Sequence, residues 1–525
     1  MPARVPVTFV PADATVWAAV GSTVLSAARS AGVIIAAPCG GRGVCGSCGV
    51  IVVDGALEPP DDIERSGLSS APQNIRLACR ARISAAVVLR PVVSPAYSSS
   101  QSNHALGQAL VAGIDLGTTT VSAVLVGRDS GMELGRGTVP NIQQSWGADV
   151  LSRVSAALDG AASELANDAS SSVVAALMGA CGDAGSCIGD IDRVVIAGNT
   201  AMHALLVGAD VSTLASAPFS LPDGLLQPLS GPLRDALPGV EIEFVMPIAS
   251  FVGGDTTAGL LAAGMIGAQS PELLVDIGTN AEISAVTSLG VTVASAPAGP
   301  AFEGFGISSG GPWGQGAIEQ VGAKGDELRI VVAGGGEPGW LCGSGLVSAI
   351  ATLRRAGHIN ADGLMVSTGP WLDRFTHMGD VLGFALSADK NNAPLLLQTD
   401  VRAFQMAKAA VAAGVVAVFA HAGIKPQSVR RLVVSGGFGS TLNPVDLVEL
   451  GVLPEDLGDR IESAGNTSLL GAAMIAFDRG LLQEVERGLS GVRHLELAQY
   501  PEFMASYVSH TALEPFRLKR GIFGR

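Results

Sequence analysis

The stretch CGGRGVCGSC, residues 39–48, places Cys39, Cys45 and Cys48 in a loop that also contains four glycines. Because glycine has no side chain, such a backbone can wrap closely around a group that the sulfurs hold. A fourth cysteine, Cys79, follows further along the chain. The spacing matches the plant-type [2Fe–2S] rule of Cys-x4-Cys-x2-Cys with a distant fourth ligand, except that the first gap has five residues. The four cysteines are therefore predicted to hold a [2Fe–2S] cluster.

Zinc is the alternative metal, because four thiolates also make a closed tetrahedral zinc site. Structural zinc sites usually use two closely spaced cysteine pairs, and Cys39 and Cys79 belong to no such pair. The spacing therefore favours the cluster over zinc.

Strand patterns flank the cysteine loop at residues 5–10, 50–53 and 85–92, and a helical stretch before the loop ends at Gly32. Residues 1–92 resemble a ferredoxin domain of the β-grasp class, including the RLAC sequence around the last cysteine. A [2Fe–2S] domain of this kind carries one electron at a time. This part of the chain is therefore predicted to transfer electrons.

Composition limits the remaining possibilities. The chain of 525 residues has 32 Lys and Arg against 47 Asp and Glu, a net charge of −15, which argues against a nucleic-acid partner. The longest apolar run, 409–420, is shorter than a membrane span and is predicted to be a buried core helix. No apolar signal segment precedes the first strand, and the cysteines outside the predicted cluster form no disulfide framework, so we expect a cytoplasmic protein.

A change of composition follows the ferredoxin-like segment. Residues 93–110 are rich in serine, contain Pro95 and show almost no apolar periodicity, which is typical of a flexible linker. The linker is expected to let the electron carrier move.

Beyond the linker, one pattern occurs twice. AGIDLGTTT at 112–120 and LVDIGTN at 274–280 each predict a strand, a tight Asp-x-Gly-Thr turn and a second strand. Each is followed by a later strand that ends in glycine, in RVVIAGNT at 193–200 and in RLVVSGGFG at 431–439. A single such turn could be an ordinary hairpin, but two copies in the same order predict an internal duplication.

The predicted halves are residues 111–268 and 269–525, and their turns have the composition of phosphate-binding loops. Glycine lets backbone amides point at anionic oxygens, and threonine hydroxyls add hydrogen-bond donors. Asp115 and Asp276 can hold Mg²⁺ or position a water for attack on the γ-phosphate. The residues predicted to contact the nucleotide are Gly117, Thr118, Thr119, Gly278, Thr279, Asn280, Gly343, Ser344, Gly436, Gly437 and Gly439.

Other polar residues leave two interpretations open. Asp255, in a Gly-Gly-Asp-Thr-Thr turn, is either a third catalytic carboxylate or a helix N-cap. Glu303 either contacts substrate or Mg²⁺, or holds its glycine-rich loop in place by a polar contact. His203 is expected to lie at a helix end with its hydrogen-bonding groups paired. Asp400, Arg402 and Lys408 lie at helical spacing, which indicates a solvated face or a surface for a partner.

The layout of the two halves resembles the superfamily of acetate and sugar kinases, Hsp70 and actin, whose halves close around ATP. It is most similar to one branch, the reductive activators of corrinoid proteins, which carry a [2Fe–2S] ferredoxin domain ahead of the ATPase. The similar stretches include residues 141–143, 198–203, 251–255, 298–304, 398–402 and 465–468. The predicted fold is an α+β β-grasp ferredoxin domain followed by a duplicated α/β ribonuclease-H-like ATPase.

The resemblance implies an ATP-dependent one-electron reduction of an inactive Co(II) corrinoid to Co(I) on a corrinoid methyltransferase protein. The implied cofactors are a [2Fe–2S] cluster, ATP and Mg²⁺. The expected partners are that corrinoid protein and an external low-potential electron donor, without nucleic acid or membrane, and the apolar composition is compatible with a homodimer. One alternative is an ATP-driven activator of a radical dehydratase or ring reductase, which the N-terminal ferredoxin argues against. Another is a nucleotide-gated redox sensor in which the cluster delivers no electron.

Overall fold

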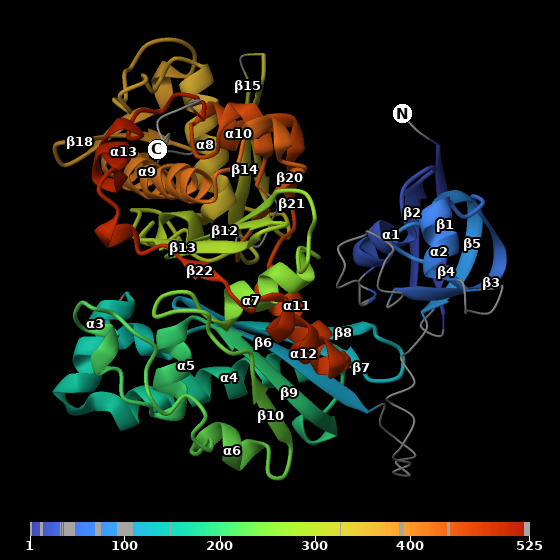
Figure 1. Ribbon diagram of the computed structural model, residues 1–525. Coiled ribbons are helices and arrows are strands. Elements are labelled where there is room, and N and C mark those ends of the chain that lie inside the picture. The colour runs from blue at the N-terminus through green and yellow to red at the C-terminus, as the bar shows by residue number, and fades with distance from the viewer. Residues whose placement is uncertain are drawn as a thin grey trace. The chain divides into compact units, whose positions relative to one another are not determined.

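The computed structural model describes residues 3–10, 14–31, 33, 35, 48–68, 75–91, 109–147, 149–325, 327–387, 393–437 and 442–518. The predicted linker therefore lies almost entirely outside the described residues. The chain forms two compact units (Figure 1). The first unit contains Met1–Ala268 together with Thr467–Ser490, and the second contains Gln269–Asn466 together with Gly491–Arg525.

The N-terminal part of the first unit is built on a mixed five-stranded sheet in the order β2-β1-β5-β3-β4. Its strands are β1 (Arg4–Phe9), β2 (Ala14–Ala19), β3 (Gly49–Leu57), β4 (Ile75–Leu77) and β5 (Ile83–Pro91), with helices α1 (Val24–Ser30) and α2 (Asp62–Gly67). Strands β1 and β5 are parallel, whereas the other neighbours are antiparallel. Val7, Phe9, Val24, Leu77 and Leu89 form its buried core. This is the predicted β-grasp arrangement.

The rest of the first unit surrounds a second five-stranded sheet in the order β10-β9-β6-β7-β8. Its strands are β6 (Leu110–Leu116), β7 (Thr120–Gly127), β8 (Glu133–Pro140), β9 (Ile191–Gly198) and β10 (Glu241–Phe244). The helices are α3 (Val150–Ala156), α4 (Ala162–Ala184), α5 (Thr200–Val207), α6 (Pro232–Ala236), α7 (Gly254–Ala262), α11 (Thr467–Phe477) and α12 (Gly480–Gly488). Strands β6, β7 and β8 are antiparallel neighbours, and β9 and β10 run parallel to β6.

Two helices cover opposite faces of this sheet at very short range. A Cβ added to Gly137 of β8 would lie 2.1 Å from the carbonyl oxygen of Ala176 in α4. A Cβ added to Gly113 of β6 would lie 2.4 Å from the backbone nitrogen of Ala473 in α11. Glycine is required at both positions because any side chain would push the helix away from the sheet. Figure 1 shows the red helix α11 beside β6 of the same unit, although the two are distant in sequence.

The second unit repeats this topology. Its main sheet has the order β21-β20-β11-β12-β13-β22, in which β11, β12 and β13 are antiparallel neighbours and β20 and β21 run parallel to β11. Its strands are β11 (Glu272–Ile277), β12 (Ala281–Thr287), β13 (Gly290–Ala296), β20 (Arg431–Ser435), β21 (Ile461–Ser463) and β22 (Arg493–His494). Strands β6 to β10 thus correspond in order and direction to β11, β12, β13, β20 and β21. The predicted internal duplication is confirmed.

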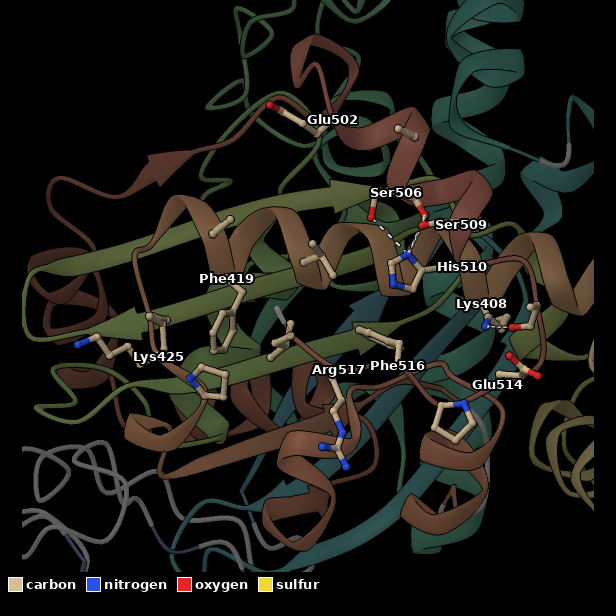
Figure 2. Close-up of a pocket in the computed structure, with 18 of the residues that line it drawn as sticks. Lys408, Phe419, Lys425, Glu502, Ser506, Ser509, His510, Glu514, Phe516 and Arg517 are labelled. Carbon is tan, nitrogen blue, oxygen red and sulfur yellow. Dashed lines mark hydrogen bonds between the residues drawn. The ribbon is translucent and has the colours of Figure 1, made fainter. Parts of the chain in front are cut away.

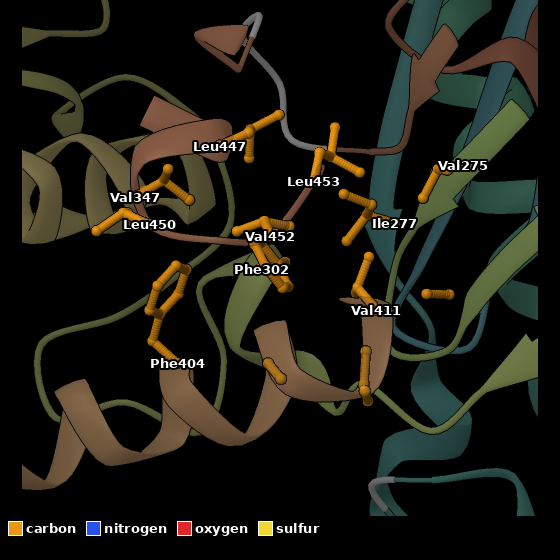
Figure 3. Packing of buried hydrophobic residues seen from close by; sticks show 14 of the residues in the cluster. Val275, Ile277, Phe302, Val347, Phe404, Val411, Leu447, Leu450, Val452 and Leu453 are labelled. Carbon is orange, nitrogen blue, oxygen red and sulfur yellow. The ribbon is translucent and has the colours of Figure 1, made fainter. Parts of the chain in front are cut away.

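The described part of the second unit also contains four α-helices and two smaller sheets. The helices are α8 (Gly343–Arg355), α9 (Gln398–His421), α10 (Pro444–Glu449) and α13 (Phe503–Ser509). Two three-stranded sheets contain β14 (Ala317–Lys324), β15 (Glu327–Val332) and β16 (Trp340–Leu341), and β17 (Phe375–Met378), β18 (Val381–Ala385) and β19 (Leu395–Leu397). Figure 3 shows part of the core, which includes Phe302, Phe404, Val411 and Ile277. The rings of Phe302 and Phe404 pack edge to face, with their centroids 5.4 Å apart.

Helix α9 has the length and apolar composition of a membrane-spanning helix, but 78% of its most apolar window is buried inside the protein. Val411, Val415 and Val418 on this helix are all inaccessible to solvent. The predicted buried core helix at 409–420 is therefore confirmed.

Candidate functional site

Two of the four predicted cluster cysteines meet in the ferredoxin-like part. Cys48 immediately precedes β3 and Cys79 follows β4, and the pairing of Gly49 with Leu77 brings them together. Both thiols are buried, and their Sγ atoms are 3.2 Å apart. Two thiolates this close can bind the same iron atom. Cys39 and Cys45 lie outside the described residues.

A buried ion pair fixes the segment that carries Cys79. Arg76 Nε donates to Glu64 Oε1 at 2.8 Å, and the same oxygen accepts a hydrogen bond from the backbone nitrogen of Leu77 at 2.8 Å. Glu64 is only 1% exposed, so water cannot solvate its carboxylate, and Arg76 supplies the compensating positive charge. Glu64 is not among the residues predicted from the sequence, because nothing in its neighbourhood distinguishes it from the other nearby acidic residues.

The first Asp-x-Gly-Thr turn lies between β6 and β7. Asp115, the penultimate residue of β6, is half-buried, and its Oδ1 accepts a hydrogen bond of 2.8 Å from Ser468 Oγ at the start of α11. A Cβ on Gly117 would lie 2.6 Å from the carbonyl oxygen of Thr120, so the turn requires glycine. Asn141 Nδ2 donates to the Gly117 carbonyl oxygen at 2.9 Å and thereby fixes the turn.

Asp255 lies close to this turn. It is in the first turn of α7, whose N-cap is Gly253, so the alternative in which Asp255 is the N-cap is wrong. Burial and, to a smaller extent, the nearby charge of Asp115 together raise the pKa of Asp255 to about 7. The structure therefore brings two of the three predicted catalytic carboxylates together in the first unit.

The second Asp-x-Gly-Thr turn lies between β11 and β12. Asp276 is half-buried, and its Oδ2 accepts a hydrogen bond of 3.1 Å from Ser435 Oγ. Thr279 Oγ1 donates to Glu303, and the Thr279 carbonyl oxygen accepts a hydrogen bond of 2.7 Å from the backbone nitrogen of Gly299. Glu303 thus connects its glycine-rich loop to the turn, which agrees with the second of the two interpretations given for it.

Packing accounts for some glycines that were predicted to face the nucleotide. A Cβ on Gly343 would lie 1.6 Å from the carbonyl oxygen of Phe302, and the neighbouring Ser344 is 4% exposed. Gly436 has a φ of 147°, a backbone conformation that favours glycine, whereas Gly437 is exposed with open space beside its Cα. Gly439 lies outside the described residues. Nucleotide contact by this group stays a prediction.

The prediction of a solvated face or partner surface on α9 is wrong for Asp400 and Lys408, which are buried, whereas Arg402 is exposed as predicted. Asp400 is 2% exposed and accepts hydrogen bonds from the backbone nitrogens of Ser308 and Leu397, both at 2.8 Å. Lys408 is 1% exposed, and its Nζ donates to the carbonyl oxygen of Ala512 at 2.5 Å. These side chains attach neighbouring segments to α9.

Burial also changes the protonation of Lys408 and His203. It lowers the pKa of Lys408 to about 7, although the nearby charge of Glu514 acts in the opposite direction. It lowers the pKa of His203 to about 4, and the neutral ring lies 3.1 Å from the Leu225 carbonyl oxygen and stacks on Phe244. The expected satisfied role of His203 is confirmed.

A cavity of about 1090 Å³ lies in the second unit between α9, α13 and residues 510–518 (Figure 2). Phe419, His510 and Phe516 line it, and Lys408 lies at one end. Of the residues predicted to contact the nucleotide, those that the structure describes do not line this cavity.

Three family models match consecutive parts of the chain. The 2Fe-2S iron-sulfur cluster binding domain matches residues 8–84, the RACo middle region matches 110–268, and the C-terminal domain of RACo, described as the ASKHA domain, matches 270–520. Together they cover the ferredoxin-like part and both halves of the duplication.

Individual proteins show the same similarity. The corrinoid activation enzyme RamQ of Eubacterium limosum is 31% identical over 76% of this chain and 69% of its own length. The [Co(II) methylated amine-specific corrinoid protein] reductase of Methanosarcina barkeri is 26% identical over 56% of this chain and 57% of its own length. A solved structure, the reductive activator for corrinoid, iron-sulfur protein, superimposes with a TM-score of 0.73 at 25% identity and covers 97% of this chain and 98% of that chain.

Proposed function

This chain belongs to the family of reductive activators of corrinoid proteins, and from that premise we propose that it is an ATP-dependent one-electron reductase. Its substrate is the inactive Co(II) corrinoid of a methyltransferase protein, and reduction to Co(I) restores the nucleophile that accepts the next methyl group. The observation that carries the proposal is the joining of a ferredoxin domain to both halves of the ATPase in one chain.

Cys39, Cys45, Cys48 and Cys79 would hold a [2Fe–2S] cluster, which supplies one electron at a time when bound. The two described cysteines fit this role, because their buried thiols face each other at 3.2 Å. Anaerobically prepared protein is expected to contain two irons and two labile sulfides, and Cys45→Ser should remove most of both. Stoichiometric zinc without iron in protein made under iron-replete, anoxic conditions would contradict the assignment.

The duplicated turns would bind and hydrolyse ATP. We assign Asp115 and Asp276 to holding Mg²⁺ or positioning the attacking water, and Asp255 to assisting Asp115. In support, each of the first two carboxylates lies at the end of a strand, next to a turn that is rich in backbone and hydroxyl donors. Gly117, Thr118 and Thr119 would contact phosphate in one turn, with Gly278, Thr279 and Asn280 in the other.

An electron carrier of this kind needs ATP if the electron must move to a lower potential. A plant-type cluster has a reduction potential of about −400 mV, and each 100 mV of uphill transfer costs about 2.3 kcal/mol per electron. ATP binding and hydrolysis can cover such a gap by changing the complex with the corrinoid protein. An external low-potential donor would reload the cluster between turnovers, in the cytoplasm.

The test is cobalt reduction. Protein with a reduced cluster is mixed with a Co(II) corrinoid protein, and loss of the Co(II) EPR signal is followed with and without Mg-ATP. The proposal expects fast loss with ATP and little without it. Equal rates in both conditions would show that the role given to ATP is wrong. No reduction in either condition, with intact ATP binding, would favour the nucleotide-gated sensor.

A further inference from the structure

Both duplicated turns bring a serine hydroxyl to their aspartate, and the two serines come from different kinds of element. Ser435 Oγ in β20 donates to Asp276 Oδ2 at 3.1 Å, and Ser468 Oγ in α11 donates to Asp115 Oδ1 at 2.8 Å. The two serines are 0% and 3% exposed. Buried hydroxyl groups of this kind are held in place by their surroundings, so each can orient the carboxylate that it contacts.

Sheet register explains the pair in the second unit. Strands β11 and β20 are parallel, and Asp276 lies directly beside Ser435. In the first unit the equivalent strands β6 and β9 place Asp115 directly beside Ala197. Alanine has no hydroxyl, so this position offers Asp115 no side-chain donor. The first unit receives its hydroxyl instead from Ser468, 353 residues further along the chain.

The same hydrogen bond is therefore made twice with different parts. After a duplication, both copies would be expected to keep a hydrogen-bond donor on the neighbouring strand, beside the aspartate. A copy could lose that donor if its aspartate no longer required one. The first copy has alanine at the ladder position and still makes the bond, because α11 is packed against β6 so closely that Gly113 touches Ala473. A hydroxyl hydrogen bond to an ionised carboxylate is among the stronger ones and fixes the side-chain rotamer.

We propose that Ser468 and Ser435 are positioning residues that hold the carboxylates of Asp115 and Asp276 in the orientation that Mg-ATP hydrolysis requires. The inference rests on the proposed ATPase function. Neither serine contacts the nucleotide itself in this scheme, so each acts through its aspartate. Loss of a hydroxyl should therefore affect metal binding and turnover, and should leave the affinity for ATP nearly unchanged.

The test compares Ser468→Ala and Ser435→Ala with Ser284→Ala in the full-length protein. Ser284 in β12 is 0% exposed, and its hydroxyl has no hydrogen-bond partner among the described residues, so it is a matched buried control. Two quantities are measured: kcat and KM for ATP, and the affinity for Mn²⁺ in the presence of ADP, read by the EPR signal of free Mn²⁺. We expect kcat and Mn²⁺ affinity to fall about 10-fold or more in the first two variants, with KM changed less than about 3-fold.

Ser468→Thr keeps the hydroxyl and should retain at least half of the wild-type kcat. The double variant Ser468→Ala with Ala197→Ser is a more stringent test. It moves the hydroxyl donor to the strand position beside Asp115, which corresponds to the position of Ser435 beside Asp276 in the other copy. Recovery of kcat and Mn²⁺ affinity is expected. A double variant with wild-type ATP affinity and circular dichroism that recovers neither would overturn the equivalence of the two donors.

The same measurements test the role of the serines separately from the ATPase activity. If wild-type protein hydrolyses ATP and both alanine variants match it in kcat and Mn²⁺ affinity, the serines do not position the aspartates. If wild-type protein hydrolyses no ATP, the proposed function fails. The Mn²⁺ affinities then still decide the role of the serines.

Discussion

The two repeated aspartates make the first residue-scale prediction. Replacing Asp115 or Asp276 by alanine should lower Mg-ATP hydrolysis about 100-fold or more, a typical scale for losing a group that stabilises phosphoryl transfer. The visible spectrum of the cluster should remain unchanged, because neither residue belongs to the ferredoxin-like part. Steady-state ATPase assays and absorption spectra make the comparison.

Asp223→Ala is the control for these variants, because Asp223 is an exposed aspartate of the same unit as Asp115. It should keep full activity. Hydrolysis that survives both site substitutions would rule out the assignment, and hydrolysis that survives only one would show that this copy of the turn has become structural.

Lys408 makes a prediction about pH. Its pKa falls from an ordinary value of 10.5 to about 7 in the folded protein. Between these two values the unfolded chain binds a proton that the folded chain does not, so the stability of the second unit should rise with pH from about 7 towards 10. Below pH 7 both states are protonated, and the full cost of the buried charge is present.

Calorimetric melting of wild-type protein and Lys408→Met at several pH values measures this effect. The melting temperature of wild type relative to the variant should increase from pH 7 to pH 9.5, because methionine carries no titratable charge. Lys425→Met, at an exposed position, should follow wild type. Parallel curves for wild type and Lys408→Met would contradict the prediction.

Sequence reasoning located the residues whose chemistry is local. Asp115, Asp276 and the cysteines were found because their function requires a fixed spacing to nearby glycines, hydroxyls or thiols. It failed for Asp400 and Lys408, whose charges lie at a spacing typical of a solvated face. Only the tertiary structure shows that Ser308 and Ala512 supply partners in the interior.

At the scale of elements, helix α11 makes the clearest prediction. Gly471 faces α7 so closely that a Cβ would lie 2.0 Å from the carbonyl oxygen of Ala258. Gly471→Val should therefore displace α11, lower the stability of the first unit by about 1–3 kcal/mol and reduce ATP hydrolysis, since Ser468 moves with the helix. Thermal unfolding by circular dichroism and ATPase assays test both effects.

Gly182→Ala in α4 is the matched control, because nothing lies within 4 Å of the added Cβ. It should be neutral or stabilise the helix by up to about 1 kcal/mol. Equal melting of the two variants would show that the contact between α7 and α11 is not tight in solution.

The duplicated sheets were predictable because each copy keeps the same order of strand, turn and strand. The attachment of α11 to the first copy was not. Nearly every residue of TSLLGAAMIAF is buried, so the sequence indicates an interior helix without indicating which sheet it covers. That information lies in the shape match of Ala473 with Gly113 and of Gly471 with Ala258, because the partners in each pair are far apart in the sequence.

At the scale of the whole molecule, deletion of residues 1–92 separates electron delivery from nucleotide chemistry. The truncated protein should lose cobalt reduction completely and keep ATP hydrolysis within about 2-fold, because the ferredoxin-like part has its own sheet and its own core. Cys45→Ser in the full-length chain is the control and should give the same pattern. Loss of ATPase activity in the deletion alone would show that the first 92 residues also support the fold of the ATPase.

The chain passes between its two compact units three times, after residues 268, 466 and 490. A gene cut after codon 268 would therefore encode a first fragment without α11 and α12, and a second fragment that carries these helices without the strands that α11 covers. Each fragment alone would expose an apolar surface and aggregate. When the two fragments are produced together, they should reassemble, because α11 of the second fragment can pack against β6 of the first. The protein could then serve as a split reporter whose reassembly is measured by ATP hydrolysis.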